Sequence, residues 1–388
     1  MKILHVYNRH RGGGGADNAW DQTIRYSIQR GLDVATFERD SKSLKLNLSG
    51  KLKAFAAGIY GWEAVKEFRQ VLADFSPDIV HAHELMPLIS PWILPECSKA
   101  KVPVVFTCYD FRLTCPVFTH FHHGQVCLRC QGGHEYHAVL NNCRGNYAES
   151  LSYALWNTVA RHFRLHDRHV AQFIALSPFV KDWLIAQGIA EHRISVIPCA
   201  VNLPERAADP AQGQYIAYAG RFVEEKGVEV LIKAARIAQL PVKLAGNFPE
   251  HPAIQEGDPV ECVTINNPVA LAEFYRGARM LVMPSIWFET FGIVAAEAMS
   301  HGIPVLASRI GALRHTVNDG VSGMLFEPHD AEGLAAMMLQ LWNDPALLRH
   351  LGEGAFQQAH GHYDAASCFG QLLQAYGKAQ QTALCSGT

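Results

Sequence analysis

Two glutamates, Glu289 and Glu297, are separated by seven residues, and a Phe-Gly step lies between them at Phe291-Gly292. An apolar, strand-like run ends before the first glutamate, and a helical pattern begins near Gly292. The backbone amides of Phe291, Gly292 and Ile293 are therefore expected at a helix start, where they can bind an anion. The two carboxylates can accept hydrogen bonds from hydroxyl groups. This spacing predicts a site for a ligand with hydroxyls on both sides of a diphosphate, such as a sugar nucleotide.

A second stretch adds positive charge to the same half of the chain. Gly220-Arg221 follows a strand-like run, and Lys226-Gly227 opens a helical pattern. An arginine offers a forked pair of donors to phosphate oxygens, and a lysine offers a mobile point charge. Taken alone, such residues at a strand end are more often solvated surface groups. Beside the paired glutamates, they favour a diphosphate site.

The elements that position these residues follow from an alternation of strand-like and helical segments. Short apolar runs stand at residues 3–7, 79–83, 102–107, 173–177, 194–198, 215–220, 242–246, 262–265, 280–284, 304–307 and 323–326. Helical patterns separate them, for example at 17–30, 227–238, 268–278 and 295–301. Such alternation predicts parallel βαβ units, here in two doubly wound, Rossmann-like α/β domains. Because ligands of such sheets bind beyond the carboxyl ends of the strands, we expect the site in a cleft across which the domains face.

The domain boundaries follow from composition. Residues 199–214 are polar, contain proline and lack periodicity, which indicates a linker. We predict an N-terminal domain over 1–200, with a loop rich in cysteine and histidine at 108–146, and a linker at 201–213. We predict a second domain over 214–365 and a C-terminal helix over 366–388 that packs back on the N-terminal domain.

The order of the motifs resembles that of a known family. The series runs Gly220-Arg221, Lys226-Gly227, Glu289-x7-Glu297, Ala298-Met299-x2-Gly302-x-Pro304-Val305 and Gly311. It is similar to the series in the retaining, metal-independent glycosyltransferases of family four, which have the GT-B fold. The resemblance implies transfer of a sugar from a nucleotide-diphosphate sugar, held mainly by the C-terminal domain, to a saccharide or lipid-linked acceptor, held by the N-terminal domain.

The resemblance also implies roles for individual residues. Arg221 and Lys226 would neutralise the donor diphosphate as it leaves. Glu289 would hold the hydroxyls of the transferred sugar, and Glu297 those of the ribose. The amides of Phe291, Gly292 and Ile293 and the loop Gly13-Gly14-Gly15 would complete the phosphate cradle. Such cations and amides stabilise the separating charges without a catalytic metal, and the family's outcome is retention at the anomeric carbon.

The N-terminal half matches the family in part. It has the early glycine loop, His81-Ala82-His83, and Thr107-x2-Asp110 ahead of Cys115-Pro116. It departs from the family at Tyr109, where a histidine close to the donor sugar is common. The resemblance implies that Asp110 is among the catalytic residues and that His83 and Tyr109 are candidates for the acceptor side. A buried structural role for His83 is an equal alternative.

Four cysteines form a second pattern, Cys115-x11-Cys127-x2-Cys130-x12-Cys143, in a segment of low hydrophobicity. Four thiolates that include one close C-x2-C pair suit a tetrahedral zinc ion, and a loop of this composition needs a staple. Free thiols or a local disulfide are the alternatives. Since four cysteines leave no open coordination position, we expect a zinc ion here to be structural.

Composition limits the function further. The chain has 34 Lys plus Arg and 36 Asp plus Glu, so its net charge is 34 − 36 = −2, which argues against nucleic acid as a partner. No apolar run reaches the roughly 18 residues of a membrane span, and the first residues are too polar for a signal peptide, so we predict a cytoplasmic protein. Lysines alternate with large apolar residues between Ser41 and Phe68. This pattern is most often an ordinary surface helix or a loop on the acceptor side, and the alternative is peripheral contact with an anionic inner-membrane surface.

The sequence therefore predicts a glycosyltransferase of polysaccharide, lipopolysaccharide or glycolipid biosynthesis in a bacterium. Two other hypotheses stay open. One is another GT-B enzyme, such as a sugar-nucleotide epimerase or a glycoside phosphorylase. The other is a sugar-nucleotide-binding protein in which Tyr109 has abolished turnover. Epimerisation without an acceptor would indicate the first, and tight binding without transfer would indicate the second.

Overall fold

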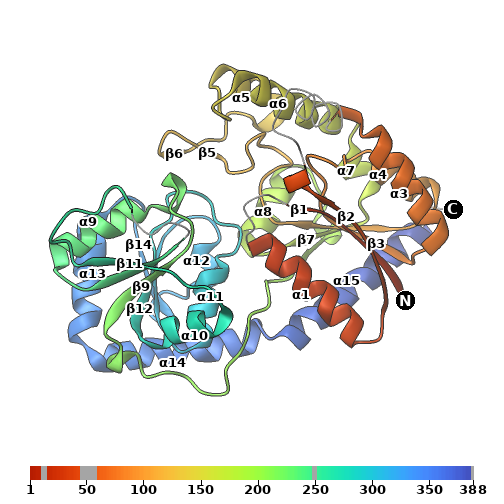
Figure 1. The fold of residues 1–388 in the computed structure, drawn as a ribbon. Coiled ribbons are helices and arrows are strands. Elements are labelled where there is room, and N and C mark those ends of the chain that lie inside the picture. Colours follow the sequence, from red (N-terminus) through yellow and green to blue (C-terminus); the bar gives the residue numbers. More distant parts are fainter. Residues whose placement is uncertain (10–14, 44–58, 247–250, 386–388) are drawn as a thin grey trace. The chain divides into compact units, whose positions relative to one another are not determined.

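The computed structural model describes residues 1–9, 15–43, 59–246 and 251–385 of the 388-residue chain. This part of the chain divides into two compact units, each with one six-stranded parallel sheet (Figure 1). The prediction of two doubly wound α/β domains is thereby confirmed. The first unit consists of Met1–His120, Cys127–Ile197 and Phe369–Thr388, and the second of Phe121–Val126 and Pro198–Cys368.

The first sheet has the strand order β2-β1-β3-β4-β7-β8. The chain passes from β1 to β2 on one side and then places β3 on the other side of β1. The strand order therefore reverses between β1 and β3, and ligands of such sheets bind beyond the carboxyl ends of the strands at that point. The strands are β1 (Lys2–Arg9), β2 (Asp33–Asp40), β3 (Ile79–Glu84), β4 (Val104–Cys108), β7 (Gln172–Ala175) and β8 (Ile194–Val196).

The second sheet repeats this plan, with the order β11-β10-β9-β12-β13-β14. Here β10 and β12 lie on opposite sides of β9, so the strand order reverses between β9 and β12. The strands are β9 (Tyr215–Ala219), β10 (Val242–Ala245), β11 (Val260–Val263), β12 (Ala278–Met283), β13 (Val305–Ser308) and β14 (Gly323–Phe326).

Helices connect the strands in both units. Those of the first unit are α1 (Gly15–Gln29), α3 (Trp62–Phe75), α4 (Ile93–Lys99), α5 (Tyr136–Leu140), α6 (Tyr147–His162), α7 (Leu165–His169), α8 (Pro178–Ala186) and most of α15 (Ala365–Cys385). Those of the second are α9 (Val228–Ala238), α10 (Pro268–Arg276), α11 (Ile293–Ser300), α12 (Leu313–Thr316), α13 (Ala331–Asn343) and α14 (Pro345–His362). Ser177, Asn267 and Asp330 cap α8, α10 and α13, since each side chain accepts a backbone N–H of the first helical turn.

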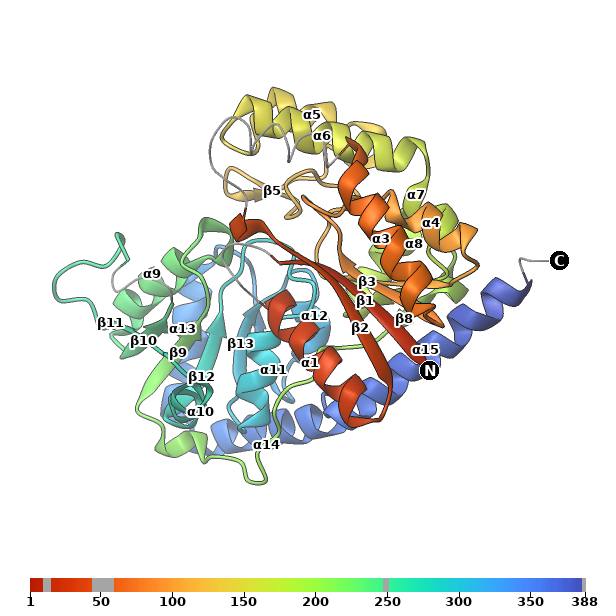
Figure 2. The same cartoon turned by 45° about the vertical axis from the view of Figure 1, so that its right-hand side comes forward.

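Two helices cover the same face of the first sheet. Trp20 of α1 stacks on Tyr7 of β1, with ring centroids 4.9 Å apart. On the same face, the Tyr376 hydroxyl of α15 lies 2.7 Å from Nδ1 of His81 in β3. Helix α3 covers the other face, and Figures 1 and 2 show α1 and α3 on opposite sides of the strands. The first sheet is therefore buried on both faces, as parallel sheets usually are.

The second sheet has its largest apolar core against α9 and α13. Leu231 of α9 and Met338 of α13 are fully buried there against Ile216, Leu244 and Val282 of the central strands. Helices α10 and α11 lie on the opposite face (Figure 1). Burial of whole apolar side chains stabilises each unit by about 1.5–3 kcal/mol per residue before chain entropy is counted.

Two features were not expected from the sequence. Strand β2 lies at the edge of the sheet, and its sequence, Asp33–Asp40, was not among the predicted strands. A short hairpin, β5 (Phe121–His122) with β6 (Gln125–Val126), belongs to the second unit, although it lies in the sequence of the first. The predicted linker, residues 201–213, belongs to the second unit, whose main segment begins at Pro198.

None of the described helices is long and apolar enough to cross a membrane. Most of the predicted basic amphipathic segment, residues 44–58, lies outside the described residues, so the prediction of membrane contact stays a prediction. In the described part of it, Trp62 begins α3 with 69% of its surface exposed, and Lys42 is exposed.

We expect replacement of Tyr376 by phenylalanine to lower the free energy of unfolding by about 1–3 kcal/mol, because it leaves a nitrogen of buried His81 without its partner. Urea denaturation would measure this change. The matched control is Tyr147→Phe, since Tyr147 is 65% exposed. Equal stability of the two variants would show that α15 is not held through this hydrogen bond.

Candidate active site

The loops after β9 and β12 lie side by side at the carboxyl edge of the second sheet. The two strands are neighbours, and the backbone N–H of Ile286 donates to the carbonyl of Glu225 at 3.0 Å. Gly227 has a φ of 65°, and a Cβ there would lie only 1.9 Å from the carbonyl oxygen of Pro284. Only glycine permits this approach, which brings the neighbouring Lys226 to the loop after β12.

Three donors converge on one oxygen of Glu289. Lys226 Nζ lies 2.7 Å from Oε1, Ser285 Oγ 2.8 Å and Trp287 Nε1 3.0 Å. Oε2 takes part in none of these three bonds. The carboxylate is buried, with 8% of its side chain exposed. The lysine and the two neutral donors therefore hold Glu289 in one orientation, with one oxygen occupied.

These donors also decide the charge of Glu289. Burial alone would raise its pKa, but the positive charge of Lys226 and the hydrogen bonds from Lys226, Ser285 and Trp287 outweigh burial and lower the pKa below its usual value. Glu289 is therefore ionised at neutral pH. A buried carboxylate in this state can accept hydrogen bonds from hydroxyl groups and can stabilise a developing positive charge.

A third loop fixes the backbone of Glu289. The N–H of Ala312 donates to the Glu289 carbonyl at 3.0 Å. Gly311 has a φ of 54°, and a Cβ there would lie 2.9 Å from the Glu289 nitrogen. The glycine noted in the motif series thus allows the loop after β13 to pack directly on Glu289.

Helix α11 begins immediately after the Phe-Gly step. Gly292 has a φ of 89° and its carbonyl accepts the N–H of Ala295, so the helix starts at Ile293 as the sequence indicates. Glu297 lies on its second turn, half-buried, and its Oε2 accepts a 2.9 Å hydrogen bond from Tyr275. Burial raises the pKa of Glu297, while the bond from Tyr275 opposes that rise.

The other predicted donor-side residues lie differently. Arg221 is at the carboxyl end of β9 with 51% of its side chain exposed, and its guanidinium is 3.9 Å from Glu225. The structure therefore joins Lys226 to Glu289 and leaves Arg221 at the solvent edge. Gly13 and Gly14 lie outside the described residues, and Gly15 is the exposed first residue of α1.

In the first unit, Asp110 follows β4 and is held by an arginine that the sequence analysis missed. Arg112 donates from Nε to Asp110 Oδ1 at 2.8 Å, and its Nη2 bonds to Oδ2 and also lies 3.0 Å from Glu84 Oε1. All these groups stand at the carboxyl edge of β3 and β4. The Asp110-x-Arg112 spacing could have predicted that Arg112 contacts Asp110. Nothing in the sequence pointed to Glu84 except that it directly follows His83. Asp110 is thus fixed by two-point contact rather than exposed to solvent.

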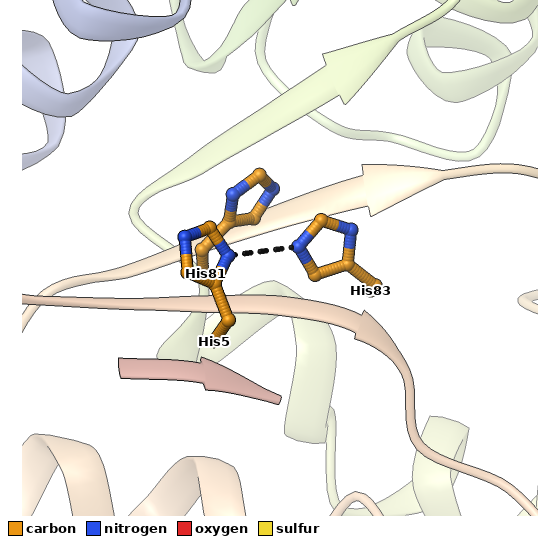
Figure 3. A group of neighbouring side chains, drawn as sticks. All are labelled: His5, His81 and His83. Carbon is orange, nitrogen blue, oxygen red and sulfur yellow. Dashed lines mark hydrogen bonds between the residues drawn. The ribbon is translucent and has the colours of Figure 1, made fainter. Parts of the chain in front are cut away.

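Three histidines form a buried cluster beneath this edge (Figure 3). His5 of β1 and His83 of β3 are joined through Nδ1 and Nε2 at 3.2 Å, as Figure 3 shows by its dashed line. His83 Nδ1 lies 3.0 Å from the Tyr109 hydroxyl, and His81 Nε2 lies 2.8 Å from Oγ1 of Thr107. The cluster therefore connects the interior of the sheet to Tyr109 at its carboxyl edge.

Among the described His, Cys, Asp and Glu side chains, these three histidines are the one group of three or more whose potential metal-ligand atoms all lie within 4.8 Å of one another. Its geometry does not suit a metal ion. The rings of His81 and His83 stack with centroids 3.9 Å apart and planes 30° apart, whereas a shared metal must lie near the plane of each ring. His81 also has a hydroxyl partner on each nitrogen. We therefore interpret the cluster as a hydrogen-bonded network of neutral imidazoles.

The four predicted zinc ligands all lie in the first unit. Cys115 and Cys130 are buried, and Cys127 and Cys143 are half-buried. In the described part of the chain none of the four forms a disulfide. The zinc prediction itself stays a prediction at this point.

The family model for glycosyltransferase family 4 matches residues 13–205, and the model for glycosyl transferases group 1 matches residues 202–358. This chain belongs to the family 4, group 1 glycosyltransferases. The resemblance inferred from its motifs is thus confirmed.

Individual relatives agree with this family. The chain is 34% identical over 168 residues to a D-inositol 3-phosphate glycosyltransferase of Arthrobacter sp. (strain FB24). The matched region covers 39% of this chain and 40% of the relative. The chain spans about half the length of the first such relatives, 40–54%.

Solved structures show the same fold. Sucrose-phosphate synthase (tll1590) from Thermosynechococcus elongatus superposes with a TM-score of 0.71 over 100% of both chains, at 20% identity. Anabaena Alr3699/HepE in complex with UDP and glucose gives a TM-score of 0.64 over 96% of this chain and 98% of that one, at 17% identity. The GT-B fold is thereby confirmed for this family member.

The buried histidines predict a loss of stability in acid. Burial lowers the pKa of His5 to about 3 and those of His81 and His83 well below 6.5. Below pH 6.5 the unfolded chain binds protons that the folded chain cannot, so the free energy of unfolding falls as pH falls toward 5, by about 1.4 kcal/mol per pH unit for each histidine.

Urea denaturation between pH 7 and 5 would test this. We expect His5→Phe to have a shallower pH slope than the natural chain, whatever its stability at pH 7. His315→Phe, at an exposed histidine, is the matched control. An unchanged slope in His5→Phe would contradict the buried neutral state.

Proposed function

We propose that this protein is a retaining, metal-independent glycosyltransferase that moves a sugar from a nucleotide-diphosphate sugar to a saccharide or lipid-linked acceptor. The observation that carries the proposal is the Lys226–Glu289 contact of 2.7 Å at the carboxyl edge of the second sheet. It lies where the strand order reverses between β9 and β12, which is where doubly wound sheets bind nucleotides.

Glu289 holds the transferred sugar in this proposal. Its Oε1 is occupied by three donors, so Oε2 is the oxygen for sugar hydroxyls. As the anomeric bond breaks, the sugar ring gains positive charge, and a carboxylate fixed in place stabilises this charge without reorganising. Because the contact strengthens as charge develops, it contributes more to the transition state than to ground-state binding.

The leaving diphosphate gains negative charge at the same moment. Lys226 and Arg221 supply cations, and the amides of Phe291, Gly292 and Ile293 at the start of α11 supply N–H donors and the positive end of a helix dipole. The family resemblance assigns the sequence Gly13-Gly14-Gly15 to the donor phosphates as well. With these groups neutralising the diphosphate, the reaction does not need a divalent cation.

Glu297 binds the ribose hydroxyls. Tyr275 fixes its Oε2, which leaves Oε1 for a ligand and sets the direction of the carboxylate. Glu297 lies about one turn into α11, after the amides proposed to bind the phosphates. The nucleoside is joined to the diphosphate at the end opposite the sugar, so its ribose would lie near this turn of the helix.

The acceptor side uses the first unit. Tyr109 stands in place of the family's usual histidine, and stacking and hydrogen bonding to His83 orient it, with ring centroids 5.8 Å apart. Asp110, held by Arg112, sets the turn after β4. Tyr109 can donate or accept one hydrogen bond but, unlike a histidine, cannot carry positive charge.

Retention of configuration at the anomeric carbon is explained in this proposal by front-face attack, in which the departing phosphate takes the acceptor proton.

The cellular role follows at a coarser level. We infer a place in bacterial polysaccharide, lipopolysaccharide or glycolipid biosynthesis, in the cytoplasm, with peripheral contact at the membrane through the basic segment of residues 41–68. The relative named for D-inositol 3-phosphate and the neighbour bound to UDP and glucose support a nucleotide-sugar donor and a hydroxyl acceptor.

Replacement of Glu289 by glutamine tests its role. The donor is first chosen as the UDP-, GDP- or ADP-sugar that most raises the melting temperature with EDTA present. We expect the variant to lower kcat for donor hydrolysis by about 10²-fold or more and to change donor affinity by less than about tenfold. Glu229→Gln, at an exposed glutamate on α9, is the control. Equal losses in kcat and affinity would remove Glu289 from the transition state. Donor binding with no turnover in the natural chain would favour a binding protein.

Replacement of Arg221 by alanine tests the diphosphate site. We expect affinity for the free nucleoside diphosphate to fall by about 10- to 100-fold, because a charged hydrogen bond contributes roughly 1.5–3 kcal/mol. The control is Arg276→Ala: Arg276 is 47% exposed and 3.8 Å from Glu273, which matches the exposure of Arg221 and its distance to Glu225. Calorimetric titration would measure both. Unchanged affinity in Arg221→Ala would exclude it from the site.

A further inference from the structure

Three side chains form a line of hydrogen bonds from the interior of the first sheet to its carboxyl edge. His5 Nδ1 lies 3.2 Å from His83 Nε2, and His83 Nδ1 lies 3.0 Å from the Tyr109 hydroxyl. Figure 3 marks the bond between the two histidines. His5 and His83 are 0% and 1% exposed, whereas Tyr109 is half-buried directly after β4. The line therefore connects a fully buried ring to a hydroxyl at the edge of the sheet.

Each of the two histidine rings carries a single N–H. Burial holds the pKa of both rings well below 6.5, so at neutral pH each ring has one nitrogen that donates and one that accepts. His5 Nδ1 and His83 Nε2 share one hydrogen bond, so only one of these two nitrogens carries a proton. The position of the proton on His5 therefore decides the position of the proton on His83.

The second nitrogen of His5 distinguishes the two arrangements. Nε2 is buried and has no hydrogen-bond partner within the described residues. A proton on Nε2 would be a buried donor without an acceptor, which folded proteins rarely contain, whereas an unused acceptor is tolerated more often. We therefore place the proton of His5 on Nδ1.

This placement gives the line one direction. His5 donates from Nδ1 to Nε2 of His83, so His83 carries its own proton on Nδ1 and donates to the Tyr109 oxygen. The planes of the His83 and Tyr109 rings are 15° apart, and this stacking keeps the phenol in place for the bond. Because the Tyr109 oxygen accepts from His83, its own O–H is directed away from the histidine.

We propose that His5 is a positioning residue for the sugar transfer, and that it acts through His83 to make Tyr109 a hydrogen-bond donor to an oxygen of the substrate. This inference rests on the proposed function. The oxygen belongs to the nucleotide sugar or to the attacking hydroxyl, and both present lone pairs to a donor. Position 109 thus has a fixed donor, although it lacks the histidine that is usual in the family.

Two variants of equal shape test the role of His5. The amide nitrogen of asparagine lies as many bonds from Cα as Nδ1 of histidine, so His5→Asn keeps an N–H for His83. Leucine has the same branched shape without a donor, and in His5→Leu the Tyr109 O–H can turn inward to His83. With the nucleotide sugar chosen above, we expect kcat/KM for hydrolysis to fall about three- to tenfold in His5→Leu, as in Tyr109→Phe, and less than about twofold in His5→Asn.

A purely structural role predicts the opposite order for the two variants. Asparagine buries an amide oxygen without a partner, so His5→Asn is expected to be less stable than His5→Leu in urea denaturation. Higher activity in the less stable variant therefore indicates the N–H rather than packing. Equal activity losses in His5→Asn and His5→Leu, or full activity in Tyr109→Phe, would overturn the proposal.

The double variant His5→Leu/Tyr109→Phe shows whether His5 acts through Tyr109. We expect it to be no slower than Tyr109→Phe alone, because the hydroxyl that His5 directs is already absent, and additive losses would contradict the proposal. Calorimetric titration of the nucleotide sugar then identifies the substrate oxygen. A loss of affinity in both single variants assigns it to the nucleotide sugar, and a loss in kcat alone assigns it to the attacking water or hydroxyl.

A measurement without turnover separates this inference from the proposed function. NMR spectra of the full chain with nitrogen-15-labelled histidine distinguish Nδ1–H from Nε2–H rings, and the variants His5→Asn and His83→Asn identify the two signals. We expect Nδ1–H on both rings in the natural chain. A proton on Nε2 of either ring would overturn the inference even if the sugar is transferred. If no nucleotide sugar is hydrolysed while both rings carry Nδ1–H, the proposed function fails and the direction of the line stands.

Discussion

The convergence of Lys226, Ser285 and Trp287 on one oxygen of Glu289 is the contact on which the candidate site depends. Taking a carboxylate and an ammonium out of water costs several kcal/mol per ion, and only good geometry and added hydrogen bonds offset that cost. The two neutral donors supply those bonds. A buried ion pair is weak evidence of stabilisation, so the arrangement is better explained by what an ionised, fixed carboxylate can do to a sugar that becomes positively charged.

The sheet and three glycines make that contact possible. Parallel pairing of β9 with β12 brings the loop of Lys226 beside the loop of Glu289. Gly227 and Gly311 allow the flanking loops to touch at distances that no side chain permits, and Gly292 starts α11 in a left-handed conformation. The chemistry thus rests on backbone positions as much as on charged side chains. The histidine cluster performs a related task in the first unit, where it orients Tyr109 from within the sheet.

The sequence revealed what is encoded locally. Glu289, Gly292 and Glu297 lie within one loop and helix, so their spacing alone indicated the helix start and the two carboxylates. Strand β2 was missed because an edge strand as rich in polar residues as Asp33–Asp40 carries little hydrophobic signal. The Arg112–Glu84 contact and the His81–Tyr376 bond were missed because their partners come from separate elements, 112 − 84 = 28 and 295 residues apart. Pairings of that kind follow from the topology and cannot be deduced from spacing.

The central claim is that Glu289 and Lys226 hold the reacting end of a nucleotide sugar. A crystal structure with the nucleotide sugar that binds most tightly would test it most directly. The account predicts sugar hydroxyls on Oε2 of Glu289, with the diphosphate against Lys226 and the amides of residues 291–293. A nucleotide sugar bound elsewhere, or one whose sugar points away from Glu289, would contradict it.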